Sequence, residues 1–447
     1  MPIPSSSSAL PRIVIVGGGA GGLGLATQLG HKLGRSQQAE IILVDKNRTH
    51  IWKPLLHEVA TGSLDADLDG VVYSAHAVKH GYHFQLGTFE QLDCNAKQIT
   101  LAAITDAKGK TLLPQRQLSF DKLVIAVGSV SNDFGTPGVK DHCFFLDSHE
   151  QANRFHDHLL DSFTRVHQAH EQHNATTGGQ QNQLNIAIVG AGATGVELSA
   201  ELYHVTEMLK VYGLSKMTAD KLSIDLIEAG PRILPALPER ISASARQELS
   251  KLGVNVRENT RIAEATSQGF VTDKGELIQA NLMLWAAGVK APDFIANLAG
   301  FELNRNHQIV VKPTLQSSTH DDIFVIGDCC ACEQADGKLV PPRAQSAHQM
   351  AQCVETNLVN FFNQQPLQDY QYVDYGSLVN LSRFSTVGSL MGNLTKNSMF
   401  VEGKIARFMY ISLYRMHQKS IHGSLKTFGL WLTEKMMRVV RPRMKLH

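Results

Sequence analysis

RIVIVGGGAGGLGLATQLG, residues 12–30, decides the fold of this 447-residue chain. Its first apolar residues are mostly β-branched and predict a buried parallel strand, and apolar residues at helical spacing predict a helix after it. Between them lies Gly17-x-Gly19-x-x-Gly22. Gly17 permits a tight turn, Gly19 lets the backbone approach a pyrophosphate, and Gly22 lets helix and strand pack closely. The helix N-terminus then offers N–H groups to the phosphates, so the stretch predicts a dinucleotide site.

A second apolar run follows this helix and ends in an acid. Residues 40–45, EIILVD, predict a second strand that Asp45 closes. An acid at this place in a dinucleotide fold accepts hydrogen bonds from a ribose. One isolated glycine pattern is weak evidence, but a strand, a helix and a terminal acid around it predict a Rossmann-like domain.

The pattern occurs again in NIAIVGAGATGVELSAEL, residues 185–202. A strand, Gly190-x-Gly192-x-x-Gly195 and a helix follow one another as before, and the next strand, LSIDLIEAG, reaches Glu228. An acid there disfavours a 2′-phosphate, so we expect this site to take NADH rather than NADPH. The nearby Arg232 weakens this preference.

Two dinucleotide sites in one chain predict two dinucleotides. Flavin enzymes that oxidise a nicotinamide bind FAD in one domain and receive NADH in the other. A duplicated site for a single ligand is the alternative. Two more apolar runs end at Gly128 and Gly288, as the closing strands of such domains do. IFVIGDC, residues 323–329, is similar to a late FAD motif, in which Gly327 lets the backbone come close and Asp328 accepts hydrogen bonds from the ribityl chain.

We therefore expect an α/β fold with two Rossmann-like domains, similar to flavoproteins of the glutathione reductase type. The FAD domain is expected in residues 1–145 and 305–390, the NADH domain in residues 146–304, and a C-terminal membrane-associating region in residues 391–447. The apolar fraction of 43% and the charged fraction of 19% fit several globular domains. The start of the chain lacks the apolar core of a secretory signal, and no run of about 18 apolar residues predicts a spanning helix.

The six cysteines do not follow the pattern of a disulfide reductase. Such enzymes carry a cysteine pair soon after the first ribose acid, but HIWKPLLHEVATG, residues 50–62, has none and offers Lys53 near the flavin instead. The clustered cysteines in residues 329–332 are expected to be reduced structural thiols, because a metal site usually needs more widely separated ligands. A sulfide-oxidising enzyme that uses Cys143 and Cys353 is the alternative.

A second signal lies in VPPRAQSAHQM, residues 340–350. Ala344-Gln345-x-Ala347-x-Gln349 places small residues and two amides at the start of a predicted helix. Small residues let a flat ring approach a flavin, and the two glutamines share one helix face and could bond quinone carbonyls. From the spacing alone, a capped helix that packs on the sheet with its glutamines in solvent is the better interpretation.

The chain resembles the type II NADH:quinone oxidoreductases of the proteobacterial kind, which are single-subunit respiratory enzymes. The resemblance extends over nearly the whole chain, through GGGAGGLGLATQLG, LVDKNRTHIWKPLLHEVATGSLD, GATGVELSAEL, PPRAQSAHQM and GSLVNLSRFSTVGSLMGNL. It implies that Ala344, Gln345, Ala347 and Gln349 line a quinone site. It also implies that Glu197 lies near the nicotinamide and couples to the quinone side. An acid that only favours the helix dipole is the alternative for Glu197.

The resemblance also implies the reaction and its setting. Two electrons would pass from NADH through non-covalent FAD to ubiquinone or menaquinone without proton pumping, with Glu197, Gln345 and Gln349 as catalytic residues. The enzyme would lie on the cytoplasmic face of the bacterial inner membrane as a peripheral homodimer. Two rival functions fit the glycine patterns as well: a soluble flavin reductase that acts on a thiol or protein partner, and a non-catalytic NADH sensor.

The end of the chain is strongly basic. Residues 404–447 hold ten lysines and arginines against one acid, whereas the remainder carries a net charge of −8. Two helical segments broken near Gly423 are expected, with apolar residues at helical spacing and the aromatic residues Tyr410 and Trp431. Helices with apolar and basic faces lie in the interface of anionic phospholipid, and so many apolar residues make nucleic acid a poor partner. Packing of both helices on the body or on a dimer mate is the alternative.

Overall fold

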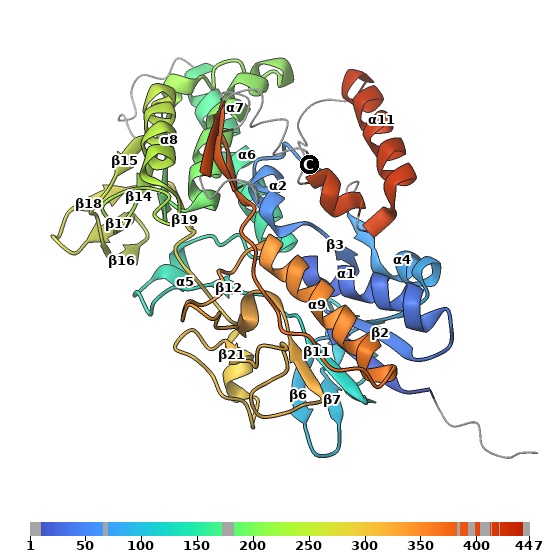
Figure 1. Ribbon diagram of the computed structural model, residues 1–447. Coiled ribbons are helices and arrows are strands. Elements are labelled where there is room, and N and C mark those ends of the chain that lie inside the picture. Colours follow the sequence, from blue (N-terminus) through green and yellow to red (C-terminus); the bar gives the residue numbers. More distant parts are fainter. Residues whose placement is uncertain are drawn as a thin grey trace, which may run out of the picture. The chain divides into compact units, whose positions relative to one another are not determined.

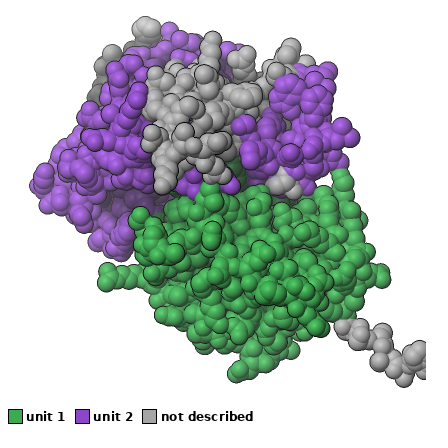
Figure 2. Space-filling view, in the orientation of Figure 1, with its two compact units in different colours: residues 1–52, 70–130, 289–373 green, residues 53–69, 131–288, 374–447 purple. Residues whose placement is uncertain are grey.

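The structure of the chain is a computed structural model that describes residues 10–65, 70–171, 183–381, 385–391, 398–402, 412, 414–419 and 421–440. Its contacts divide the chain into two compact units, which Figure 2 draws in different colours. Unit 1 comprises Met1–Trp52, Gly70–Val130 and Val289–Val373, and unit 2 comprises Lys53–Asp69, Ser131–Gly288 and Asp374–His447. Each unit holds one of the two glycine patterns.

A five-stranded parallel sheet forms the centre of unit 1 (Figure 1). Its order is β22-β11-β1-β2-β5, so the chain leaves β1 toward one edge and later returns to build the other edge. The apolar residues of β1 are buried, and helix α9 packs on α1. The elements are β1 (Arg12–Val16), α1 (Ala20–Leu29), β2 (Glu40–Asp45), β5 (His83–Leu86), β11 (Lys122–Ile125), β22 (Ile323–Val325) and α9 (Ala344–Phe362).

Short elements complete unit 1. The three-stranded antiparallel sheet β10-β7-β6 is the largest of them. The others are short ladders, one helix and 3-10 turns. Their bounds are β3 (Thr49–His50), β4 (Val71–Val72), α4 (Tyr73–His80), β6 (Phe89–Asp93), β7 (Gln98–Leu101), β8 (Ile104–Thr105), β9 (Thr111–Leu113), β10 (Arg116–Ser119), η5 (Asp293–Asn297), β21 (Ile309–Val310), η6 (Gly327–Cys329) and β23 (Cys330–Ala331).

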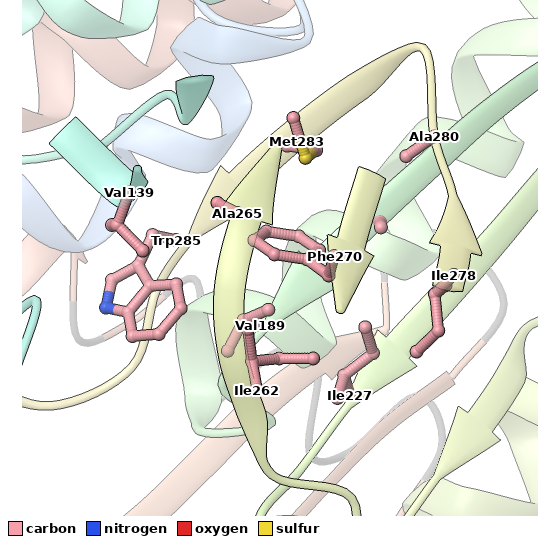
Figure 3. Close-up of a cluster of buried hydrophobic side chains, with 11 residues drawn as sticks. Val139, Val189, Ile227, Ile262, Ala265, Phe270, Ile278, Ala280, Met283 and Trp285 are labelled. Atoms are coloured by element: carbon pink, nitrogen blue, oxygen red, sulfur yellow. The ribbon is translucent and has the colours of Figure 1, made fainter. Parts of the chain in front are cut away.

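Unit 2 repeats the same parallel arrangement with four strands in the order β15-β14-β13-β19. The antiparallel sheet β16-β17-β18 contributes to a common core with it (Figure 3). Phe270 of β17, Trp285 of β19 and Val139 of α5 meet in this core. The elements are α5 (Val139–His142), α6 (His149–Glu171), β13 (Leu184–Val189), α7 (Ala193–Leu209), β14 (Leu222–Ile227), α8 (Glu239–Leu252), β15 (Asn255–Arg257), β16 (Ile262–Thr266), β17 (Gly269–Thr272), β18 (Leu277–Gln279) and β19 (Leu282–Trp285).

Unit 2 also collects segments from both ends of the chain. Helix α2 (Leu56–Ala60) packs on α6 and α7, and strand β24 (Gly376–Leu381) packs on α7 and α8. Strands β25 (Ser385–Met391) and β26 (Ser398–Glu402) extend β24 into an antiparallel sheet. The units therefore differ in extent from the domains expected from the sequence. Residues 53–69, 131–145 and 374–390 join unit 2, and residues 289–304 join unit 1.

The C-terminal region contains β26 and, among its later described residues, helix. Residues 412, 414–419 and 421–422 are helical, Gly423 has φ +81, and α11 (Ser424–Val440) follows it. The predicted break at Gly423 is thus present. Tyr410, Lys404 and the basic Arg441, Arg443 and Lys445 lie outside the described residues. Within the described part of the chain, each helix is too short or too polar to cross a membrane.

Candidate functional site

The first glycine pattern forms a tight loop between β1 and α1. Gly17 has φ +105, and its N–H donates to the carbonyl of Val44 over 2.8 Å. A Cβ on Gly22 would collide with the carbonyl oxygen of Gly17, whereas a Cβ on Gly19 would meet no atom within 4 Å. Gly19 therefore borders open space at the N-terminus of α1, where the first N–H groups of a helix can bind phosphate.

The second glycine pattern has the same geometry in unit 2. Gly190 has φ +101, and its N–H donates to the carbonyl of Ile227 over 2.8 Å. A Cβ on Gly195 would collide with the carbonyl oxygen of Gly190, and a Cβ on Gly192 would meet nothing within 4 Å. Each glycine pattern thus has one glycine that faces open space and one that is required for close packing.

The two predicted ribose acids are tied to these loops in matching ways. Asp45 accepts the N–H of Gly18 at 2.6 Å and the N–H of Asn47 at 2.7 Å. Glu228 accepts the N–H of Ala191 at 3.0 Å and the N–H of Gly230 at 2.8 Å. Burial raises the pKa of Asp45 above its ordinary value, although the two backbone donors oppose this rise.

Three further predicted residues lie at the ends of β11 and β22 in unit 1. Gly128 has φ +71 and Gly327 has φ +76, and a Cβ on Gly128 would meet no atom within 4 Å. The hydroxyl of Ser129 donates to the carboxylate of Asp328 over 2.7 Å. Asp328 is half-buried. Open glycine loops, a helix N-terminus and two acids fit the pyrophosphate and hydroxyl groups of FAD in unit 1. In unit 2, the Gly192 loop and Glu228 fit a second dinucleotide in the same way.

Helix α9 brings the predicted quinone signature to the first glycine loop. A Cβ on Gly21 would lie 3.0 Å from the carbonyl oxygen of Ala347, and a Cβ on Gly327 would lie 3.5 Å from the Ala347 methyl group. The N–H of Gly327 also lies 3.2 Å from the sulfur of Met350. Small side chains therefore allow α9 to approach both loops of unit 1, with Ala344 as its first residue.

The two glutamines of the signature have different surroundings. The amide of Gln349 is bound at both ends by Val373, since its nitrogen donates to the Val373 carbonyl at 2.8 Å and its oxygen accepts the Val373 N–H at 3.0 Å. The amide nitrogen of Gln345 donates to the hydroxyl of Tyr372 over 3.1 Å. Gln349 thus anchors the segment that follows α9, whereas Gln345 contacts the side chain of Tyr372.

The structure assigns Lys53 to unit 2. Its ammonium group lies 3.3 Å from the carboxylate of Asp147, which also accepts the N–H of Ser131 at 3.0 Å. Asp147 was not found by sequence reasoning. Because the residues that fit FAD belong to unit 1, a contact between Lys53 and the flavin stays a prediction.

Glu197 lies in a buried cluster of ionisable groups on helices α2 and α7. It accepts the N–H of Asn380 at 2.9 Å, and Nδ1 of His57 lies 3.6 Å from its other oxygen. Glu201 follows one turn later on α7 and accepts a short hydrogen bond from the hydroxyl of Ser63. Glu197, Glu201 and His57 are all less than 9% exposed.

Burial determines the charges in this cluster. It raises the pKa of Glu197 to about 8, with smaller contributions from the nearby carboxylates Glu58 and Glu201, while the Asn380 N–H opposes the rise. Burial also lowers the pKa of His57 to about 4. At neutral pH, His57 is therefore neutral and Glu197 holds a proton, which is unusual for a glutamate and typical of functional sites.

The cysteines are free in the structure and have the properties of inert thiols. Burial raises the pKa of Cys329 to about 12 and that of Cys332 to about 11, and it raises the pKa of Cys330 well above its ordinary value. Burial also raises the pKa of Cys143 to about 12 and that of Cys353 to about 11. A thiolate is needed for attack or metal binding, so these values disfavour a redox role. No group of three or more metal-ligating side chains occurs among the described residues.

Sequence reasoning found Glu197 but missed its companions. Glu201 is four residues further along one helix, so helical spacing could have indicated it. His57, Glu58 and Ser63 come from a segment more than 100 positions away, and nothing in its sequence indicates that it folds against α7.

Comparison with known proteins gives the family. The family model for pyridine nucleotide-disulphide oxidoreductases matches residues 11–351. A type II NADH:quinone oxidoreductase from Haemophilus influenzae (strain ATCC 51907 / DSM 11121 / KW20 / Rd) is 48% identical over 444 residues, which cover 98% of this chain and 100% of the relative. The chain belongs to the type II NADH:quinone oxidoreductase family. The resemblance seen in the sequence is thereby confirmed, and the chain is an oxidoreductase.

Other members and structures agree with this family. A type II NADH:quinone oxidoreductase from Staphylococcus aureus (strain NCTC 8325 / PS 47) is 31% identical over 406 residues, which cover 89% of this chain and 92% of that protein. The structure of NDH2 from Plasmodium falciparum in complex with NADH has a TM-score of 0.78 at 19% identity, covering 97% of this chain and 100% of that one. This likeness confirms the predicted α/β two-dinucleotide fold, whereas membrane association of the C-terminal region stays a prediction.

Proposed function

We propose that this type II NADH:quinone oxidoreductase family member transfers two electrons from NADH, through non-covalently bound FAD, to a membrane quinone without pumping protons. The observation that carries this proposal is the duplication of one geometry. Each unit pairs an open glycine, Gly19 or Gly192, with an anchored acid, Asp45 or Glu228. The names of the relatives support NADH and quinone as substrates.

Unit 1 would hold FAD, and unit 2 would hold NADH. Bound FAD would supply the two-electron transfer that amino-acid side chains lack. The glycine loops would bind the pyrophosphates, and the acids would bind ribose hydroxyls. We assign FAD to Gly17, Gly19, Gly22, Asp45, Gly128, Gly327 and Asp328 of unit 1, and NADH to Gly190, Gly192, Gly195, Glu228 and Gly288 of unit 2.

Proton balance gives Glu197 its proposed role. Oxidation of NADH to NAD⁺ and reduction of a quinone to its quinol consume one proton in total. Because its pKa is about 8, Glu197 carries a proton at neutral pH and can release it without a large free-energy cost. We propose that it passes protons to the reacting centre, while neutral His57 lies 3.6 Å away.

We assign Gln345 to the quinone and Gln349 to the positioning of residues around it. The amide nitrogen and the amide oxygen of Gln349 both form hydrogen bonds with the Val373 backbone, so both groups already have a partner. Gln345 lies one turn earlier on α9, and Ala344 and Ala347 keep the same region of the helix small. Quinone carbonyls accept hydrogen bonds of the kind that an amide N–H donates.

Steady-state NADH oxidation with a short-chain quinone tests this proposal. We expect quinone-dependent turnover by the FAD-loaded chain. Gln345→Leu should raise the KM for quinone about fivefold, because about 1 kcal/mol of hydrogen bonding is lost, and should leave the KM for NADH unchanged. Gln352→Leu, an exposed position on the same helix, is the control.

Two outcomes would contradict different parts of the assignment. A wild-type chain that binds FAD but shows no quinone-dependent turnover would exclude the proposed function, and a thiol reductase or an NADH sensor would then be favoured. A Gln345→Leu variant with an unchanged KM for quinone would exclude only the role of Gln345.

We also propose that the C-terminal region binds the anionic membrane surface at the cytoplasmic face of the bacterial inner membrane, in a homodimer. Leu425, Phe428, Leu432 and Met436 recur on one side of α11, and all four are exposed. The stripe follows helical spacing (α11 in Figure 1). Lys426 is exposed on the same helix. An apolar stripe with neighbouring cations is typical of a helix that lies in the lipid interface.

Removal of the chain from Lys404 onward should release the protein from membranes and leave FAD bound. Phe428→Glu should weaken binding to anionic vesicles about tenfold or more, because burial of this ring contributes about 2 kcal/mol. Vesicle sedimentation measures both changes, with Val78→Glu, at an exposed position of α4, as the control. Truncated protein that still sediments with vesicles in high salt would contradict the anchor.

A further inference from the structure

Phe134 is an exposed aromatic residue in a backbone conformation that large side chains avoid. Its φ is +51, in the left-handed region, and it is 64% exposed. Leu234 and Leu315 also have positive φ, but both are buried, so packing of their side chains offsets the strain. Phe134 gains no such burial. A strained residue that its own packing does not stabilise indicates a constraint imposed by function.

The loop around Phe134 is clamped to the end of strand β19. The side-chain oxygen of Asn132 accepts the Phe134 N–H at 2.9 Å. The carbonyl of Asn132 accepts the indole N–H of Trp285 at 2.8 Å. The backbone N–H of Asn132 donates to the carbonyl of Gly288 at 3.3 Å. Trp285 is itself fixed in the core of unit 2 beside Val139 (Figure 3). The position of Phe134 is therefore built into the unit.

The ring of Phe134 lies against Gly288. A Cβ on Gly288 would be 2.5 Å from Cζ of Phe134, so any other residue there would displace the ring. Gly288 has φ +65 and follows β19, the neighbour of β13. The strand order of unit 2 reverses between β13 and β19, because β14 and β15 lie on the other side of β13. Dinucleotides bind at the carboxyl ends of strands at such a reversal.

The two sides of this reversal face different halves of a dinucleotide. Glu228 follows β14 and would bind the adenosine ribose, and Gly192 follows β13 and would face the pyrophosphate. The nicotinamide half then extends to the remaining side, that of β19. This is where the exposed ring of Phe134 lies.

We propose that Phe134 contacts the nicotinamide half of NADH and holds it in one orientation in unit 2. This inference rests on the proposed function, since it takes NADH as the ligand of unit 2. The fixed ring offers an apolar surface to the nicotinamide riboside, and Gly288 leaves the space that the ring needs. Aromatic surfaces bind flat heterocycles by such contacts.

Binding of two ligands to the full-length, FAD-loaded protein tests this contact. NAD⁺ carries the nicotinamide, and ADP-ribose lacks it. Phe134→Ala should weaken NAD⁺ binding about fivefold to tenfold and change ADP-ribose binding less than about twofold, as expected for loss of one aromatic contact. Phe134→Tyr should restore NAD⁺ binding. Val211→Ala, an exposed apolar position in the same unit, should change neither.

The opposite results would overturn the proposal. An equal loss of NAD⁺ and ADP-ribose binding would mean that the loop supports the unit as a whole. No loss of either would place the ring outside the site. If Phe134→Ala unfolds, Phe134→Asn replaces it, because asparagine tolerates the left-handed backbone and also removes the ring. The same two binding measurements are then made on Phe134→Asn. Wild-type protein that neither binds NAD⁺ nor oxidises NADH would instead contradict the proposed function, and the inference with it.

Discussion

Gly192→Val should raise the KM for NADH at least about 100-fold, a loss of about 3 kcal/mol, and leave FAD content and melting temperature unchanged. A Cβ at Gly192 meets no protein atom within 4 Å, and its φ of −72° suits any residue. The protein itself therefore tolerates the new side chain. The valine instead fills the space where the pyrophosphate would approach the N-terminus of α7. Steady-state kinetics and the flavin absorbance of the purified variant measure both quantities.

The other glycine loop supplies the reciprocal control. A Cβ at Gly19 also meets no protein atom within 4 Å. Gly19→Val should therefore lose FAD, because the valine would fill the space where the pyrophosphate would approach the N-terminus of α1. Gly195→Val should behave differently from both, since its side chain collides with the carbonyl of Gly190 and lowers the melting temperature. A Gly192→Val variant that binds NADH normally, or that loses FAD instead, would contradict the assignment of the two units.

Glu197→Gln should lower kcat about 100-fold and raise stability at alkaline pH. Glutamine keeps the acceptor for the Asn380 N–H but cannot release a proton, and proton transfer by a placed acid contributes at least about 100-fold. The wild-type rate should fall as pH rises through about 8, where Glu197 loses its proton. The variant should lack this fall. Initial rates between pH 6 and 9.5 measure the difference.

The stability effect has a definite sign. The pKa of Glu197 is about 8 in the folded chain, against an ordinary value of 4.5 for a glutamate. Between these two values the unfolded chain has lost the proton and the folded chain keeps it, so wild-type stability falls as pH rises and levels off above pH 8. The melting temperature of Glu197→Gln relative to wild type should therefore increase across this window.

An exposed acid provides the control for Glu197. Glu239→Gln, on α8, should change neither the rate profile nor the pH dependence of melting. A Glu197→Gln variant that is less stable than wild type at pH 8, or that retains the alkaline fall in rate, would contradict the proton-transfer role.

The elements that follow from local sequence were predictable. Strand, glycine loop and helix at Gly17 and at Gly190 each depend on residues within a few positions of one another. The acids Asp45 and Glu228 were found for the same reason, because each closes the next strand along the chain. The break at Gly423 follows from a residue type that alone adopts positive φ freely.

The remaining features depend on contacts between distant parts of the chain. His57 approaches Glu197 only because α2 folds onto α7, and Asn380 arrives from β24. The occupied amide of Gln349 depends on Val373, 24 residues later. The positive φ of Phe134 could not be predicted, because a phenylalanine rarely adopts this backbone conformation. Local sequence patterns do not predict these features, because contacts between distant parts of the chain determine them.

The double anchoring of Glu228 limits how coenzyme preference can be engineered. Each of its two carboxylate oxygens already holds a backbone N–H, one in the glycine loop at Ala191 and one at Gly230. An exchange of this acid for a neutral or basic residue, the usual first step toward NADPH, would also release the loop that meets the pyrophosphate. A redesigned coenzyme site here therefore needs a new acceptor for both N–H groups before it needs a new cation.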